Sequence, residues 1–499
     1  MKPVVKLPCA SPEEVGIPSA VMEAFLDALE DGKTEMHGLM VMHHGKVCAQ
    51  GWWQPYGPGK RHTCHSLTKT YMGTAVGIAI REGLLTLDTL LVDIFPEYRE
   101  GSTLADVKVR DLLCMGSGVE SMPEATKDWV RDFFRQPQLH APGTAFFYNS
   151  AGSTLIAHLI EKVSGEPVYD YLRPRLFDKI GINSDISYPT DIEPELDMWG
   201  HRMQATTQDN LLLMKLYMDD GVAGGERILD HEYVKLATSL QNDSSTEARG
   251  NPLATDNFVG YGFQMWMCKY PGAYRADGAG GQFSVVIPDK DMIVAITEAG
   301  TGAEGPQHTL DCIWDVLLPG VKDEALAPDP VSHARLTRRL RSLSIAAPVY
   351  APDSPLAEQI SGRSFELDSG CFSLFYSEAF SRIAAGDEEG TLSFHFGIME
   401  GSVRWTTGGT ETKVEFAMDG TRRRNHIQMP FCNSHECYAA GWWSSPDCFE
   451  LEMHWTEAVQ VKHVVFHFAG DRVEISGKSD YMPGNEERGK MIRAEAHLV

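Results

Sequence analysis

Two β-hairpin patterns, far apart in the chain, restrict the fold of this sequence more than any other feature. The first covers residues 38–53 with His44-Gly45 as its turn, and the second covers 283–297 with its turn at Pro288–Asp291. Between them the apolar spacing is mainly helical, from about 66 to 240. A strand frame at both ends that encloses a helical middle predicts one α+β domain closed by its own termini.

One helix is also predicted before the first hairpin in the chain, and another after the second hairpin. Apolar residues recur at i, i+3 and i+4 over about 19–30, and Gly32 is placed to end that helix. The second helix is expected at 308–318, directly after the second hairpin. The frame of the domain therefore contains helices as well as strands.

The composition changes at about residue 320. Pro, Ala and Asp are frequent over 320–360, where one basic amphipathic helix is predicted at Ala334–Leu343. Beyond this segment, short alternating patterns with turn signals between them predict an antiparallel β-barrel or sandwich. These patterns are Thr391–Phe396, Lys413–Phe416, Phe449–Trp455, Val464–Phe468 and Arg472–Ile475. We therefore expect a catalytic domain at 1–319, a linker at 320–360 and a barrel domain at 361–499.

Composition excludes several classes of protein. The 499 residues are 43% hydrophobic and 23% charged, which is enough apolar material for large cores and rules out disorder over most of the chain. The net charge of −25 disfavours a partner that is nucleic acid or an anionic membrane, because phosphate binding needs Lys and Arg. The first residues lack the apolar run of an export signal, and no run of 18 apolar residues occurs. We expect a cytoplasmic protein.

The cysteines do not form a pattern that predicts disulfides. Ten of them are scattered without regular spacing, which in a chain read as cytoplasmic indicates reduced thiols. The densest group is Cys432, His435, Cys437 and Cys448. Its gaps do not match the paired spacing of zinc sites, so thiols are favoured there over a metal. We expect neither a metal nor a cofactor.

A single Ser-x-x-Lys motif, Ser66-Leu67-Thr68-Lys69, opens a strongly apolar helix that ends at Gly83. The i, i+3 spacing places Lys69 above Ser66 on the same helix face. Burial and the helix dipole both disfavour a cation there, which lowers the pKa of a lysine toward the value that a general base needs. The alternative is a capping serine with a lysine that reaches solvent, and these residues alone leave both open.

A second motif, Pro142–Ser150, precedes an amphipathic helix that Gly165 closes. Together with Ser66–Lys69, it resembles the serine β-lactamase and penicillin-binding-protein superfamily, in particular the class C β-lactamase-like serine hydrolases and esterases. The resemblance extends over about 11–318 and includes the turn-like segment Leu112–Gly118. It implies that Tyr148 lies beside the nucleophile, although Ser150 stands where the family has Asn.

The resemblance also implies the remaining parts of the site. The third family motif, normally Lys or His followed by Thr-Gly, falls on Ala276-Asp277-Gly278, so its cation is missing. The backbone N–H groups of Ser66 and Ala279 would form the oxyanion hole, and Ser150, Ala276, Asp277 and Gly278 would bind substrate. The implied fold is a β-lactamase/transpeptidase-like domain, an antiparallel sheet with a helical region, followed by a lipocalin-like barrel.

Other conspicuous residues have simpler interpretations. His65 is favoured as a packing or loop histidine over a base, because adjacent side chains at a helix start diverge. Ser150 is favoured as the cap of a helix that begins near Ala151, and Arg275 as a solvated strand residue over an anion anchor. The tryptophans of the tail are favoured as barrel packing over ligand contacts; they are Trp442, Trp443 and Trp455.

The predicted function is a serine hydrolase that forms an acyl-enzyme on Ser66 and cleaves a small ester or amide. Lys69 would accept the serine proton, and Tyr148 would pass a proton to the leaving group. Alternatives are an acyltransferase with the same residues, a D-amino-acid peptidase or weak β-lactamase, and a ligand-binding relative without catalysis. The barrel would shape the cleft or a homo-oligomer.

The absence of a Lys or His from the third motif predicts which substrate charge the site disfavours. An acid at Asp277 should repel a carboxylate, by roughly 1 kcal/mol at 4 Å in water and more where water is excluded. The net charge of −25 adds to this repulsion. We therefore expect uncharged esters or amides to react faster than penicillins or cephalosporins.

Overall fold

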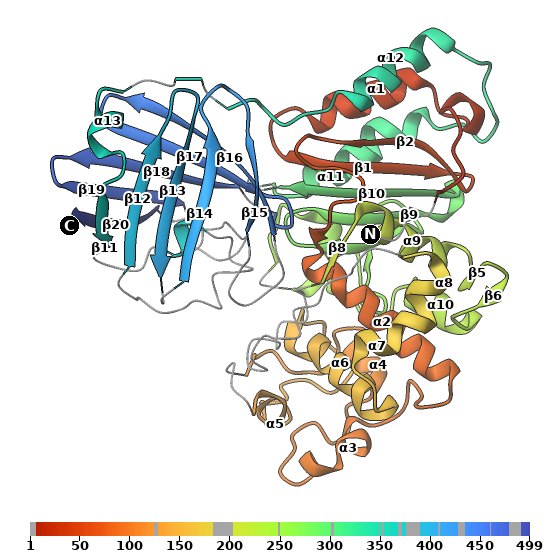
Figure 1. The fold of residues 1–499 in the computed structure, drawn as a ribbon. Coiled ribbons are helices and arrows are strands. Elements are labelled where there is room, and N and C mark those ends of the chain that lie inside the picture. The colour runs from red at the N-terminus through yellow and green to blue at the C-terminus, as the bar shows by residue number, and fades with distance from the viewer. Residues whose placement is uncertain are drawn as a thin grey trace. The chain divides into compact units, whose positions relative to one another are not determined.

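The chain folds into two compact units, the first ending at Leu343 and the second starting at Ser344 (Figure 1). The computed structural model describes residues 6–123, 128–182, 203–247, 250–300, 304–348, 350–351, 354–367, 372–375, 390–407, 410–427, 435–459, 461–478 and 491–499. Among these residues, no helix is both long and apolar enough to cross a membrane.

The first unit is built on a six-stranded antiparallel sheet in which the two predicted hairpins are neighbours. The N-terminal hairpin joins the later one through β1 and β10, with Glu35 opposite Ala299 and His43 opposite Met292. Every residue of β10 is buried, because helices cover both faces of the sheet. The strand order is β2 (Lys46–Trp52), β1 (Glu35–His43), β10 (Met292–Ala299), β9 (Gln282–Ile287), β8 (Tyr274–Gly278) and β7 (Trp266–Met267).

One face of this sheet carries helices from both ends of the unit (Figure 1). Helix α1 (Ser19–Leu29) packs against α11 (Gln307–Cys312), the turn η9 (Ile313–Leu317) and α12 (Pro330–Arg341). The helix expected in the linker is therefore present as α12. Leu336 of α12 is buried, and Arg339 forms an ion pair with Glu30, the residue that follows α1.

The opposite face carries the helical region, with α2 (Thr68–Arg81) at its centre. Every residue of α2 from Thr68 to Ala79 is buried, and a Cβ on Gly77 would lie 2.5 Å from the Tyr233 ring. This burial explains why the helix is apolar on all sides. Around it lie α4 (Val109–Leu113), α5 (Trp129–Phe133), α6 (Ser150–Ser164), α7 (Val168–Leu172), α8 (Asp178–Ile180), α9 (Thr207–Met218) and α10 (His231–Ala237).

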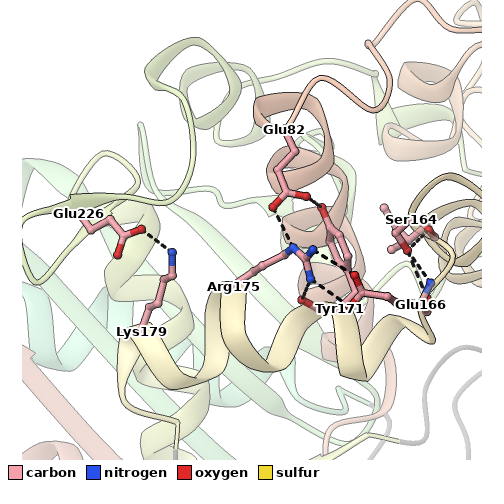
Figure 2. Close-up of polar contacts among 8 residues, drawn as sticks. Glu82, Ser164, Glu166, Tyr171, Arg175, Lys179 and Glu226 are labelled. Atoms are coloured by element: carbon pink, nitrogen blue, oxygen red, sulfur yellow. Dashed lines mark hydrogen bonds and ion pairs between the residues drawn. The ribbon is translucent and has the colours of Figure 1, made fainter.

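Ion pairs hold the C-terminal end of α2 (Figure 2). Glu82 follows the helix, and its carboxylate accepts hydrogen bonds from Arg175 Nε at 2.8 Å and from the Tyr171 hydroxyl at 2.9 Å. Arg175 also donates to Glu166 at 3.1 Å, so one guanidinium links two acidic side chains. Tyr171 belongs to α7, which is therefore tied to the helix that begins at the candidate site.

The second unit is a β-barrel. Nine strands form a ring, which is closed by a parallel contact between β14 and β16 at Ala417 and Ala440. Among the described residues, β15 lies beside the ring and pairs only with β16. Trp443 and Trp455 belong to its hydrophobic core, as predicted, whereas Trp442 stacks on the ring of His463. The strands are β11 (Ser364–Leu367), β12 (Gly390–Phe396), β13 (Glu400–Thr407), β14 (Thr410–Ala417), β15 (Arg423–Ile427), β16 (His435–Ser445), β17 (Cys448–Trp455), β18 (Lys462–Ala469), β19 (Arg472–Lys478) and β20 (Met491–Leu498).

The cysteines of the described residues are free thiols, whereas Cys371 and Cys432 lie outside these residues. Most are buried, and burial raises the pKa of several of them to about 12, which keeps them protonated at neutral pH. No group of three or more His, Cys, Asp or Glu side chains that could hold a metal occurs in the described part of the chain.

Candidate active site

The structure brings Ser66 and Lys69 together at the start of α2. Ser66 lies in the short 3-10 turn η2 (His65–Leu67), which continues directly into the helix. The Lys69 Nζ and Ser66 Oγ atoms are 2.9 Å apart, within hydrogen-bonding distance. The contact decides between the two interpretations that the i, i+3 spacing left open, and Lys69 pairs with Ser66 instead of reaching solvent.

Lys69 is buried, with 1% of its surface exposed. Burial disfavours its charged form and lowers the pKa of its ammonium from the usual 10.5 to about 7, while the charge of Asp277 acts in the opposite direction. A substantial fraction of Lys69 is therefore neutral at pH 7. A neutral amine can accept the proton of the adjacent Ser66 hydroxyl.

Tyr148 is placed beside this pair by the loop that leads into α6. Lys69 Nζ lies 5.1 Å from the centre of the Tyr148 ring, and that ring stacks on Trp266 at 5.4 Å. Burial raises the pKa of the phenol, and a hydrogen bond with the Ser66 side chain partly offsets this rise. The phenol is therefore protonated at neutral pH and can donate a proton.

Asn149, rather than Ser150, caps α6. The Asn149 side chain accepts a hydrogen bond from the Gly152 backbone N–H at 3.1 Å, and Ser150 is already the first residue of the helix. The expectation that Ser150 is the cap is wrong by one residue, because Asn and Ser are equally good caps in sequence. Asn149 also donates to the carbonyl of Val119, which fixes the loop that carries Tyr148.

The end of strand β8 packs against the turn that carries Ser66. A Cβ on Gly278 would lie 2.1 Å from the Cys64 carbonyl oxygen, so only glycine permits this approach. Ala279 follows Gly278, and Ser66 is two residues beyond Cys64. The backbone segments that carry the two predicted oxyanion-hole N–H groups therefore lie close to each other.

The residues of the third motif differ in exposure. Ala276 is fully buried in the main hydrophobic core of the first unit and offers no surface to a substrate. The side chain of Asp277 is 19% exposed and accepts a hydrogen bond from Arg275 Nε at 2.8 Å. Burial raises the pKa of Asp277, and the Arg275 guanidinium opposes this change.

Arg275 is fully buried, so its interpretation as a solvated strand residue is wrong. Its guanidinium donates to the carbonyl of Met267 at 3.0 Å and to the side chain of Asn257, in addition to Asp277. These acceptors satisfy a buried cation that strand alternation alone would place in solvent.

Sequence reasoning missed the aromatic residues behind Tyr148. Tyr261 and Trp266 form a buried cluster with Met115 and Phe146, on which Tyr148 packs. Trp266 lies opposite Arg275 across β7 and β8. A two-residue strand such as β7 is too short to show periodicity, so no local signal identified these residues.

His65 is half-buried, at a positive φ of 43°.

A model of the Beta-lactamase family matches residues 22–311, which is more than half of the sequence and includes all the residues placed in the site. The chain belongs to the Beta-lactamase family. This places it in the superfamily of serine β-lactamases and penicillin-binding proteins, as the sequence motifs predicted.

Individual relatives agree with this assignment. Penicillin-binding protein 4 of Amycolatopsis lactamdurans is 25% identical over 371 residues, which cover 64% of this chain and 92% of that protein. The 6-aminohexanoate-dimer hydrolase of Paenarthrobacter ureafaciens is 22% identical over 51% of this chain and 70% of its own length. The crystal structure of a putative beta-lactamase from Bacteroides dorei has the same fold, with a TM-score of 0.51, 14% identity and coverage of 60% of this chain and 98% of that chain.

Proposed function

We propose that this protein is a serine hydrolase that forms an acyl-enzyme on Ser66 and cleaves small esters or amides. The observation that carries the proposal is the 2.9 Å distance between Ser66 Oγ and the buried Lys69 Nζ. A hydroxyl beside an amine whose pKa is about 7 is an activated nucleophile at neutral pH. The similarity to a 6-aminohexanoate-dimer hydrolase adds support for hydrolytic chemistry.

The acylation step uses three side chains. Neutral Lys69 accepts the proton of Ser66 as Oγ attacks the substrate carbonyl carbon. The proton then passes from the Lys69 ammonium through the Tyr148 hydroxyl to the leaving oxygen or nitrogen, whose bond to the carbonyl carbon breaks. The backbone N–H groups of Ser66 and Ala279 would stabilise the intermediate oxyanion, and such donors typically contribute about 2.7–4 kcal/mol each.

Deacylation repeats the same steps with water as the nucleophile. Water attacks the acyl carbonyl, its proton passes to Lys69 or through Tyr148, and Ser66 Oγ leaves with a proton. An alcohol or amine in place of water would give acyl transfer from the same acyl-enzyme. Product analysis with and without an added alcohol distinguishes the two reactions.

A fluorophosphonate probe tests the proposal. We expect intact mass spectrometry to show one adduct on the wild-type protein and none on Ser66→Ala. Ser342→Ala, which removes an exposed serine after α12, should be labelled like the wild type. No adduct on the wild type, or an adduct that persists in Ser66→Ala, would overturn the assignment of the nucleophile.

A further inference from the structure

We propose that Asp277 is the counter-ion for a protonated amine in the acyl group of the substrate, so that the enzyme favours cationic acyl donors over neutral and anionic ones. The inference rests on the proposed acyl-enzyme chemistry at Ser66 and specifies its substrate class. It goes beyond the exclusion of carboxylates, because it assigns an attractive role to the Asp277 carboxylate.

Asp277 is the exposed member of a buried ion pair. Arg275 and Asp277 are two residues apart on β8, so their side chains project from the same face of the strand. The Arg275 side chain is 0% exposed and that of Asp277 is 19% exposed. Asp277 Oδ2 accepts from Arg275, whereas Oδ1 accepts no hydrogen bond from the residues that the structure describes. The carboxylate therefore covers the guanidinium and keeps one oxygen for another donor.

The carboxylate lies beside the proposed catalytic residues. Its charge raises the pKa of both Lys69 and Tyr148, which places it within electrostatic range of each. The residue after it, Gly278, is packed against the Cys64 carbonyl, two residues before the nucleophile. A group that binds Asp277 would thus be near the carbonyl that Ser66 attacks.

The charges behind Asp277 do not cancel its own. Arg275 interacts with a second acid, Asp256, which is fully buried and raises the Arg275 pKa together with Asp277. The Asp256 carboxylate accepts from the Gln307 side chain at 2.7 Å and from the Lys269 backbone N–H at 2.8 Å. Lys269, which also interacts with Asp256, is itself paired with Asp311, so these three carboxylates and two cations carry a net charge of −1. Lys69 adds no compensating charge in the neutral form that acts as a base.

This charge balance discriminates between acyl groups. A protonated amine on Asp277 Oδ1 would neutralise the cluster, whereas a carboxylate would add a second uncompensated charge to a partly buried site. Arg275 cannot bind the carboxylate of a substrate, because it is fully buried and its donors face Asp277, Asn257 and the Met267 carbonyl. The same carboxylate thus excludes anions and attracts cations.

The test compares p-nitrophenyl esters of 3-aminopropanoic, butanoic and succinic acid, with the rate of Ser66→Ala subtracted as background. For the wild type we expect kcat/KM for the aminopropanoyl ester to exceed that for the butanoyl ester by at least tenfold, which is about 1.4 kcal/mol. The succinyl ester should be slowest. A ratio of one or less between the cationic and neutral esters would overturn the inference.

Asp277→Asn supplies the matched variant, because it keeps the shape of the side chain and removes its charge. The cationic-to-neutral ratio should fall to about one, and the succinyl ester should gain. Each ratio is measured within one protein, so a smaller folded fraction or a shifted Lys69 pKa cancels. Asp289→Asn removes the same charge from the exposed turn at the far end of β9 and should keep the wild-type ratio. An unchanged ratio in Asp277→Asn would refute the role of Asp277.

A second measurement needs no variant. Butylammonium should slow fluorophosphonate labelling of the wild-type protein more than butanol or butyrate at equal concentration and ionic strength. Equal protection by the three compounds would contradict an amine site. If the wild type is neither labelled nor hydrolyses any ester above the Ser66→Ala rate, the proposed function itself fails. Normal labelling and turnover without charge preference would refute only the inference about Asp277.

Discussion

At the scale of single residues, the chemistry depends on a lysine that loses its proton near neutral pH. The neutral form of Lys69 is the base, and its pKa is lowered to about 7 because it is buried. The kcat/KM for an uncharged ester should therefore rise with pH through about 7, since Lys69 is protonated and inactive below that value. A profile of kcat/KM over pH 5–9 measures this rising limb.

Replacement of the lysine tests whether the limb belongs to it. Lys69→Ala should reduce kcat/KM by roughly 10²–10⁴, the usual effect of losing a general base, and should remove the limb near pH 7. Lys235→Ala, on the exposed side of α10, is the control and should leave both unchanged. A variant of Lys69 with the wild-type profile would exclude it as the base.

Tyr148 should matter most for substrates with poor leaving groups. Its phenol donates a proton to the departing atom, whereas p-nitrophenolate leaves without one. Tyr148→Phe keeps the ring that stacks on Trp266 and should lower turnover of an alkyl ester by roughly 10²–10⁴. The loss on a p-nitrophenyl ester should be clearly smaller. Equal losses on the two esters would indicate a structural role instead.

The site was predictable from sequence where neighbours along the chain create it. The i, i+3 spacing places Ser66 and Lys69 on one helix face, whereas the choice between a contact and a lysine that reaches solvent, like the assignment of Tyr148, required the family resemblance. The burial of Arg275 was not predictable, because its acceptor Asn257 lies in the short 3-10 helix Thr255–Phe258, 18 residues before Arg275 in sequence. Alternation along β8 contains no information about that segment.

At the scale of secondary-structure elements, the close approach of β8 to η2 is the geometry that function requires. Gly278→Ala would place a Cβ 2.1 Å from the Cys64 carbonyl oxygen, so the strand must move away from the turn that carries Ser66. We expect a loss of at least tenfold in kcat/KM, since oxyanion donors act only at short distances. The measurement is kcat/KM for an uncharged ester, with circular dichroism as a check of folding.

A glycine elsewhere in the same unit provides the comparison. A Cβ on Gly59 would meet no atom within 4 Å, so Gly59→Ala should leave both activity and fold unchanged. Full activity in Gly278→Ala would show that β8 does not position the oxyanion hole.

Element prediction succeeded where the pattern is local and one-sided. Helix α1 and both hairpins formed as expected, and Gly83 and Gly165 end their helices at positive φ angles. The barrel strand β16 was missed because its central residues, Ala439 to Trp443, are all buried, which removes the alternation by which strands are identified. Strand β13 was missed because its sequence, EGSVRWTT, is largely polar.

At the scale of the whole molecule, the two units have separate hydrophobic cores. The first unit ends at Leu343, after α12, and the first barrel strand β11 begins at Ser364. We propose that the connection lies between these residues and expect limited proteolysis to cut first within 344–363. Mass spectrometry of the early fragments locates the cut. Initial cleavage within α12 or within the barrel would indicate a different boundary.

The pairing of β1 with β10 also sets an order of events during synthesis. Strand β10 is made roughly 250 residues after β1, a delay on the order of 10–50 s at the usual rates of translation. During that time the hairpin β1–β2 has emerged from the ribosome without its partner strand. The helical region around α2 is complete earlier and can pack first, whereas the turn around Ser66 meets β8 only near the end of the unit. A nascent chain that stalls before β10 would therefore carry the nucleophile but lack the completed sheet beside it.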